Sequence, residues 1–199
     1  MSVTHVAAYG NNGHQIVRKL TDHPRARLVA TACFPVEKLP EPLAECEDVK
    51  HYADLEQLLN DERVELVSLC SPRRSEQVDH AIQCLEAGKA VYAEKPCAVS
   101  EADLDRLIKT SRRTGVLFRE MSGSAFIQPY LALRRIVLAG TLGEVIQVFA
   151  QKSYPYFDRR PDDEDVDGGL TLQCGVHVFR FIEHITGLNI QDVQAIETT

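Results

Sequence analysis

The sequence has no tryptophan, only two methionines and no long apolar run. No window approaches the roughly 18 apolar residues that a transmembrane helix needs. The first residues, Met1 to His5, also lack the basic stretch and apolar segment of an export signal. We therefore expect a soluble, cytoplasmic protein that neither crosses nor binds a membrane. Its 199 residues, 44% of them apolar, suffice for one full domain and part of a second.

The cysteines lack the spacing of a metal or redox site. No C-x-x-C pair occurs, and the cysteines are far apart and mostly inside apolar runs. In a chain of this length that distribution favours reduced core thiols over disulfides or zinc ligands. We therefore predict no metal site. The six are Cys33, Cys46, Cys70, Cys84, Cys97 and Cys174.

Positive charge is also in deficit. The chain carries 22 Lys and Arg against 29 Asp and Glu, a net charge of −7. A nucleic-acid surface requires clustered basic side chains facing phosphates, so this balance argues against a nucleic-acid partner. Small molecules are the expected partners.

Short β-branched runs alternate with helical patterns along the first ~120 residues, and no hairpin signal separates them. Such alternation requires crossover connections and therefore a parallel sheet with helices on both faces. We predict an α/β fold with a Rossmann-type doubly wound parallel sheet. Its expected strands span 5–9, 26–34, 64–70, 90–93 and 116–119, and its expected helices span 13–23, 55–60, 75–87 and 101–114.

The pattern changes after Met121, and we place the domain boundary there. Residues 1–122 form the predicted dinucleotide-binding domain, and residues 123–199 begin an incomplete α+β domain for substrate binding and oligomerisation. This second part is expected to contain a helix over 129–139, a strand over 144–153, a helix ending at Ile185 and a strand over 192–198. The acidic stretch 158–167 is either a solvated loop or a lid over a substrate cleft.

Three ordered motifs resemble the Gfo/Idh/MocA oxidoreductases, the family of glucose-fructose oxidoreductase and inositol dehydrogenase. Leu85 to Pro96 (LEAGKAVYAEKP) is similar to the family signature LEAGKHVxxEKP. Pro129 to Val145 resembles the helix and GxLGE turn that open the family's second domain. Gly168 to His177 (GGLTLQCGVH) resembles its GGGxLxDxGxH segment. Family members usually run well beyond 199 residues, so most of the second domain's sheet is expected to be missing here.

The resemblance implies an NAD(P)-dependent dehydrogenase or reductase that acts on a sugar, a cyclitol or a similar polyol or carbonyl compound. It assigns catalytic roles to Lys95, which would polarise the substrate oxygen, and to His177, which would exchange the hydroxyl proton. Gln173 lies four residues before His177, on the same helix face, and would contact the substrate. We expect Lys95 and His177 to meet across a cleft between the two domains.

The same resemblance assigns the cofactor-binding residues. The phosphate loop keeps Gly10 but has Asn12 and Gln15 at the other two positions of G-x-G-x-x-G, and its helix is expected to begin near Gly13. Cys33 stands where an acidic residue normally accepts the ribose hydroxyl of NAD, and Glu37 is a distant substitute. The cofactor, NAD or NADP, therefore stays open. The predicted cofactor contacts are Gly10, Asn12, Gly13, Cys33, Ser71, Pro72, Glu94, Lys95 and Pro96.

Two interpretations remain open. In the first the chain is an active oxidoreductase that uses Lys95 and His177, with Gln173 orienting the substrate. In the second it is a non-catalytic relative that senses a dinucleotide or binds a partner, because Gln173 replaces the family's catalytic carboxylate and cannot carry a negative charge. Arg73 and Arg74 either meet a phosphate or an acidic substrate, or are solvated. A homo-oligomer is expected, because the final strand would otherwise leave an unpaired edge.

Overall fold

The computed structural model describes residues 2–123, 126–154 and 161–196. The chain divides into two compact units. The first contains residues 1–121 together with 161–169, and the second contains residues 122–160 and 170–199. Each unit is described by itself below.

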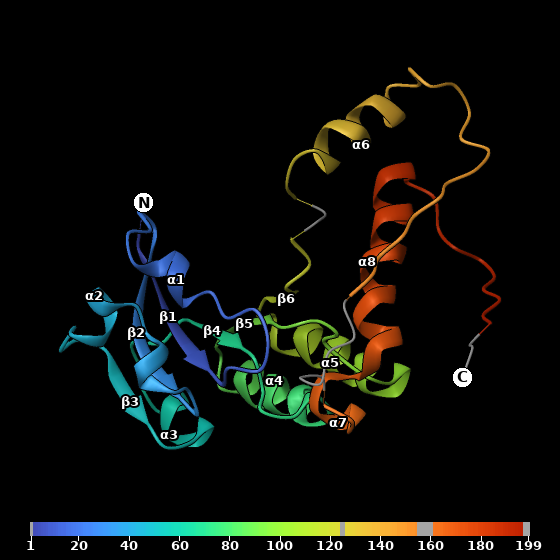
Figure 1. The fold of residues 1–199 in the computed structure, drawn as a ribbon. Coiled ribbons are helices and arrows are strands. Elements are labelled where there is room, and N and C mark those ends of the chain that lie inside the picture. Colours follow the sequence, from blue (N-terminus) through green and yellow to red (C-terminus); the bar gives the residue numbers. More distant parts are fainter. Residues whose placement is uncertain (1, 124–125, 155–160, 197–199) are drawn as a thin grey trace. The chain divides into compact units, whose positions relative to one another are not determined.

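The first unit contains a six-stranded sheet in the order β3-β2-β1-β4-β5-β6 (Figure 1). Every neighbouring pair of strands is parallel. This is the strand order of a doubly wound dinucleotide-binding fold, so the predicted fold class is confirmed. The strands are β1 (Thr4–Tyr9), β2 (Ala26–Ala32), β3 (Lys50–Tyr52), β4 (Leu66–Leu69), β5 (Ala90–Ala93) and β6 (Phe118–Glu120).

The core lies on both faces of this sheet, because successive side chains of a strand point to opposite sides. From β1, Val6 and Ala8 join one buried cluster, and Ala7 and Tyr9 join the other. The first cluster also holds buried residues of α1 (Val17–Leu20) and α2 (Glu41–Ala44), and a 3-10 turn, η1 (Val36–Lys38), lies between these helices. The second holds residues of α3 (Leu55–Leu59), α4 (Gln77–Glu86) and α5 (Glu101–Thr114).

Helix α5 has the ends that its sequence predicts. The Ser100 hydroxyl accepts a hydrogen bond from the Asp103 backbone N–H at 3.1 Å, which satisfies a donor of the first turn. At the other end Gly115 adopts a left-handed conformation with φ 69°. The predicted bounds of this helix are confirmed.

The predicted helix 13–23 is wrong at both ends, because α1 spans only Val17–Leu20. Gly13 has φ 129°, which is outside the helical region. The Gln15 amide donates to the carbonyls of Tyr9 and Ser68, at 3.1 and 2.8 Å, and so holds the preceding segment as a loop. The first helical residues expected there are therefore loop residues.

The acidic segment returns to the first unit as a docked turn and not as a free loop. Helix α7 (Glu164–Asp167) is held by Arg73, which pairs with Asp163 at 2.7 Å and with Asp165 at 3.3 Å. The Asn12 amide also donates to the carbonyl of Val166. Asp163 and Asp165 are still 55% and 65% exposed, so the described part of this stretch is a solvated turn that Arg73 anchors, and 158–160 lie outside the described residues.

In the described part of the second unit the only regular elements are helices. It contains α6 (Tyr130–Leu138) and most of α8 (Gly169–Thr186), and Tyr130 packs edge-on against Phe181 with ring centroids 5.8 Å apart. No strand occurs over the described residues 144–153 or 192–196, so both predicted strands are wrong there. Because a strand needs a hydrogen-bonded neighbour, alternating apolar residues alone do not produce one.

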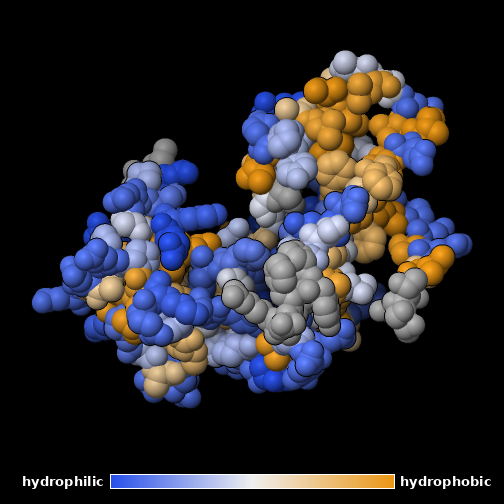
Figure 2. Space-filling model, viewed as in Figure 1, coloured by the Kyte–Doolittle hydropathy of each residue, from blue (hydrophilic) through white to orange (hydrophobic). Residues whose placement is uncertain are grey.

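Large apolar side chains are exposed along the extended part of the second unit. Ile146 is 85% exposed, Phe149 is 84% exposed and Ile196 is 95% exposed. Figure 2 shows orange apolar residues at the surface of this unit. None of the helices in the described ranges is long and apolar enough to cross a membrane.

Candidate functional site

The loop after β1 carries the first group of predicted cofactor residues. Gly10 has φ 66°, and a Cβ atom there would lie 2.0 Å from the carbonyl oxygen of Cys70. Only glycine fits this close approach of the loop to the end of β4. The Asn12 side chain donates to the Pro72 carbonyl at 3.1 Å, which ties the loop to the segment after β4.

Glu94 binds this loop from the end of β5. Its buried carboxylate accepts hydrogen bonds from the backbone N–H of His14 and from Lys95 N–H, the latter at 2.8 Å. The His14 ring Nδ1 lies 2.9 Å from the same carboxylate. A Cβ atom on Gly13 would lie 2.3 Å from Glu94 Oε2, so this position also requires glycine.

The charge of Glu94 is stabilised within the protein. Burial disfavours the carboxylate, but the hydrogen bonds from His14 and Lys95 outweigh burial, and the pKa of Glu94 is lowered. The loop between Gly10 and Gln15 thus already binds one anion, the protein's own carboxylate.

The buried side chain of Arg74 supports the loop through a backbone carbonyl. Arg74 is 1% exposed and donates to the Asn12 carbonyl at 2.8 Å and to the Gln77 side chain, while no partner for its Nε atom occurs among the described residues. Burial lowers the pKa of Arg74, and the nearby Glu94 carboxylate opposes that effect. Gln77 in turn donates to the carbonyls of Glu94 and Pro96, at 2.6 and 3.2 Å. The solvated alternative for Arg74 is wrong, because its buried guanidinium is held by the Asn12 carbonyl and the Gln77 side chain.

Lys95 and Pro96 follow β5 directly, at the carboxyl edge where open α/β sheets bind ligands. Lys95 is 3% exposed, and the peptide bond between Lys95 and Pro96 is cis. Gly168 packs against Pro96, because a Cβ atom on Gly168 would lie 2.7 Å from the proline Cγ. The end of α7 therefore covers this turn within the first unit.

The remaining predicted cofactor residues lie at the ends of β2 and β4. Ser71 is fully buried, and its hydroxyl lies 3.0 Å from Nδ1 of His80. Cys33 is exposed, has φ 50°, and donates its thiol to the Ala53 carbonyl at 3.3 Å. The Gly10 N–H donates to the Ala32 carbonyl at 2.9 Å, so the ends of β1 and β2 lie together.

A cavity of about 480 Å³ opens between the glycine loop and the segment after β2. Asn11, His14 and Arg18 line it from the loop and α1, and Glu37 and Lys38 line it from η1. From the sequence, neither Arg18 nor Lys38 was assigned to the cofactor site. Arg18 was missed because it lies before β2 in the chain, and only the fold brings α1 beside η1.

The second unit holds the other two predicted catalytic residues on α8. Gln173 and His177 are four residues apart and therefore share a face of this helix. Nε2 of His177 lies 3.2 Å from the hydroxyl of Tyr154, and the Lys152 ammonium lies 4.5 Å from the centre of the Tyr154 ring. No sequence motif pointed to Lys152 or Tyr154, although both belong to the extended segment that leads toward α8.

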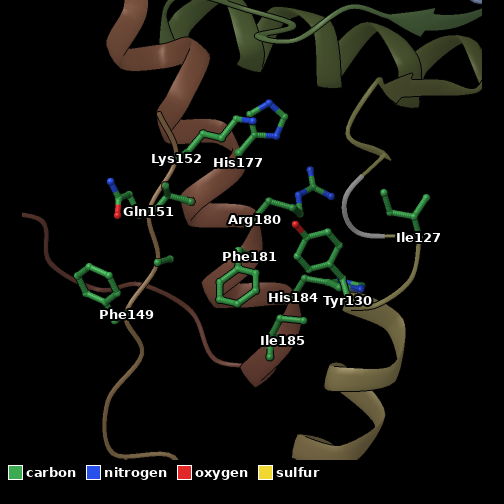
Figure 3. A pocket seen from close by; sticks show the side chains of 12 residues that line it. Ile127, Tyr130, Phe149, Gln151, Lys152, His177, Arg180, Phe181, His184 and Ile185 are labelled. Carbon is green, nitrogen blue, oxygen red and sulfur yellow. The ribbon is translucent and has the colours of Figure 1, made fainter. Parts of the chain in front are cut away.

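His177 also lines a cavity of about 440 Å³ within the second unit. In Figure 3 the Lys152 side chain extends toward His177, and the Arg180 guanidinium lies near the Tyr130 ring. The cavity combines hydrogen-bonding and aromatic side chains, as small-molecule sites do. Among the described residues no group of three His, Cys, Asp or Glu side chains could hold a metal ion.

Family models match both parts of the chain. Residues 6–121 match the model described as "Oxidoreductase family, NAD-binding Rossmann fold", named GFO_IDH_MocA. Residues 130–199 match the model of a GFO/IDH/MocA C-terminal domain. The first match alone covers more than half of the 199 residues.

Individual proteins resemble the chain as well. It is 30% identical to trans-1,2-dihydrobenzene-1,2-diol dehydrogenase of Bos taurus over 81% of this chain and 48% of the relative. It is 28% identical to myo-inositol 2-dehydrogenase of Thermotoga maritima over 73% of this chain and 43% of that enzyme. The chain thus spans about half the length of these relatives.

Among solved structures, a 3-ketoreductase from Actinomadura kijaniata in complex with NADP aligns with a TM-score of 0.78. It is 21% identical, and the alignment covers 92% of this chain and 57% of the ketoreductase. An NAD-binding protein from Listeria innocua aligns with a TM-score of 0.69 at 23% identity, over 92% and 53% of the two chains. These likenesses show the shared fold.

Proposed function

Because the chain belongs to the GFO/IDH/MocA oxidoreductase family, we propose that it is an NAD(P)-dependent oxidoreductase. It transfers a hydride between a nicotinamide cofactor and a sugar, a cyclitol or a similar polyol or carbonyl substrate. The names of two similar proteins, a dihydrobenzenediol dehydrogenase and a myo-inositol dehydrogenase, support a cyclic diol or polyol. The observation that carries the proposal is the buried Glu94-Lys95-Pro96 turn, which joins the carboxyl end of β5 to the glycine loop through Glu94 and His14.

In this proposal the first unit binds the cofactor at the loop from Gly10 to Gln15 and at the cavity beside η1. When bound, the nicotinamide accepts or supplies the hydride. Gly10 and Gly13 allow the close packing of the loop, and Asn12 and Arg74 hold its shape through the Pro72 and Asn12 carbonyls.

Lys95 and His177 handle the oxygen of the substrate. The Lys95 ammonium donates a hydrogen bond to this oxygen and stabilises negative charge that develops on it. The His177 imidazole takes the hydroxyl proton when the substrate is oxidised and returns it on reduction, a general acid–base role common for histidine. Tyr154 orients the imidazole by its contact with Nε2, and the Gln173 amide positions the substrate without ionising.

A second candidate function is a non-catalytic dinucleotide sensor or partner-binding protein. Gln173 favours it, because an amide cannot supply the negative charge that the family places one helical turn before the histidine. The contact of Glu94 with the His14 N–H favours the partner-binding form of this candidate, since the protein's own carboxylate uses a donor of the phosphate loop.

The first step of the test is a fluorescence titration of the protein with NADH and with NADPH. Binding of either cofactor is compatible with the oxidoreductase and with the dinucleotide sensor, whereas no binding of either contradicts both and leaves only the partner-binding protein. The second step measures turnover of a panel of cyclic and linear polyols by the parent, Lys95→Ala, His177→Ala and the double variant. The oxidoreductase proposal expects each single variant to lose about 10²-fold or more in kcat.

If Lys95 and His177 act on the same substrate, their effects are not independent. The loss of kcat in the double variant should then be smaller than the product of the two single losses. His23→Ala, which changes an exposed histidine outside the site, serves as the control and keeps parental rates. An inactive parent that still binds cofactor would favour the sensor.

A further inference from the structure

The end of β2 lacks the acceptor that selects NAD. In dinucleotide-binding folds an acidic residue there accepts the ribose 2′-hydroxyl, whereas a nearby arginine accommodates a 2′-phosphate. Here the residue is Cys33, whose thiol is already directed to the Ala53 carbonyl at 3.3 Å. A thiol is at most a weak acceptor, so this position offers little to a ribose hydroxyl.

The cavity at the same edge has basic side chains on both sides. Arg18 reaches it from α1 and Lys38 from η1, and both are exposed. Neither takes part in an ion pair with another described residue, so their charges are not neutralised within that part of the chain. Glu37 is the one acidic residue among those that line the cavity.

We infer that the protein selects NADP(H) over NAD(H), and that Arg18 and Lys38 bind the 2′-phosphate of the adenosine ribose. A phosphomonoester near pH 7 carries close to two negative charges and three acceptor oxygens. Guanidinium and ammonium groups bind such an anion by charge-assisted hydrogen bonds, which a ribose hydroxyl cannot match. The inference rests on the proposed function, because it names the cofactor form that this site takes.

The rival arrangement uses Glu37 as the acceptor of the ribose hydroxyls and thereby selects NAD. Glu37 lies next to Lys38 on the same short turn. NADP selection assigns the binding role to Lys38, whereas NAD selection assigns it to Glu37. A 2′-phosphate would be repelled by Glu37 and attracted by Lys38 and Arg18. A bare ribose would gain from Glu37 alone.

Binding measurements test the inference without any turnover. In isothermal titration of the full chain, we expect NADPH to bind at least about 10-fold more tightly than NADH. A factor of about 10 is the contribution of a single charge-assisted hydrogen bond. Arg18→Ala and Lys38→Ala should each weaken NADPH binding about 10-fold and change NADH binding less than about 2-fold. Higher ionic strength should reduce the preference, because exposed charges are screened.

Lys19→Ala is the matched control, because Lys19 is also an exposed cation of α1 but lines a different cavity. It should leave both affinities unchanged. Adenosine 2′,5′-bisphosphate should compete with NADPH more strongly than adenosine 5′-monophosphate, and this difference should disappear in the Arg18 and Lys38 variants. Such competition isolates the adenosine end from the nicotinamide end.

Two results would overturn the inference, and they are distinguishable. NADH binding as tight as NADPH, together with loss of NADH affinity in Glu37→Gln, would assign the ribose to Glu37 and leave the proposed oxidoreductase intact. No detectable binding of NADPH, NADH or adenosine 2′,5′-bisphosphate would overturn the cofactor site itself, and the proposed function with it.

Discussion

Gln173 is the residue on which the proposed catalytic activity depends most, because it replaces the family's carboxylate. If Gln173 only positions substrate, Gln173→Asp restores a carboxylate one turn before His177, where negative charge favours the imidazolium and strengthens the base. We expect the variant to equal or exceed the parent on a polyol panel, by about 10-fold if the charge contributes ~1.4 kcal/mol in the transition state.

The same panel with Lys95→Ala in both backgrounds provides the control, and it should abolish turnover in each. An inactive parent and an equally inactive Gln173→Asp variant, with cofactor still bound, would shift the assignment to the sensor. The steady-state rate at saturating cofactor is the quantity to compare.

Gly10 and Gly88 allow a second test at the residue scale. Both are left-handed, with φ 66° and 75°, but a Cβ on Gly10 would lie 2.0 Å from the Cys70 carbonyl, whereas nothing lies within 4 Å of one on Gly88. Gly88→Ala should therefore lower the free energy of unfolding by about 1 kcal/mol, the cost of the left-handed backbone alone. Gly10→Ala should cost at least about 2 kcal/mol more, because backbone must move. Equal losses in urea unfolding would show that the loop relaxes freely.

Among the individual elements, the end of α3 is joined to the sheet by one ion pair. Arg63 donates to both Asp61 carboxylate oxygens, at 3.0 and 2.7 Å, and also to the Val29 carbonyl of β2. Tyr52 of β3 donates its hydroxyl to Asp61 at 3.1 Å. The pair thus connects β2, β3 and the end of α3, and the Asp61 side chain is only 7% exposed.

This pair predicts an acid-dependent loss of stability. The hydrogen bond from Arg63 lowers the pKa of Asp61 from 3.8 to about 2, although burial opposes it. Because the folded pKa is the lower one, its contribution is complete above about pH 5 and disappears as the pH falls toward 2, by at most about 2 kcal/mol. The unfolding free-energy difference between parent and Asp61→Asn should shrink over this range. Arg63→Ala should remove the same pH-dependent part, and a difference that stays constant with pH would contradict the assignment.

Elements also differ in how well the sequence predicts them. The bounds of β5 and α5 were predicted because an apolar run, a capping serine and a C-terminal glycine specify them locally. β3 was missed, since Lys50-His51-Tyr52 is short and polar and pairs only because β2 lies beside it. The alternation over 144–153 predicted a strand, but pairing depends on a neighbour that no local pattern contains.

The residues of the candidate site, like the secondary-structure elements, were predicted only in part. Motifs identified Lys95 and Gly10, which lie at strand ends. Arg74 and Tyr154 gain their contacts from chain segments distant in sequence, and Arg18 shares a cavity with such a segment, so the sequence alone could not assign their roles.

For the whole molecule, the exposed apolar residues of the second unit predict self-association. Ile146 and Ile196 are 85% and 95% exposed, and apolar side chains of this size favour burial in an interface. We expect the 199-residue chain to sediment as an oligomer at tens of micromolar. Ile146→Lys with Ile196→Lys should shift it toward the monomer, whereas Leu117→Lys, at a residue of the first unit that is 56% exposed, should not. A monodisperse parental monomer would contradict this expectation.

The return of α7 to the first unit has a consequence for the order of folding. The chain leaves that unit after Met121 and re-enters it at Pro161. During synthesis all six strands emerge before α7 exists, so the sheet can assemble while Arg73 and Asn12 still lack Asp163 and Val166. Closing the intervening segment costs little more than closing a shorter loop, because the entropy grows only with the logarithm of its length. We therefore expect α7 to dock after the sheet has assembled, so that the turn at Pro96 acquires its cover of Gly168 last.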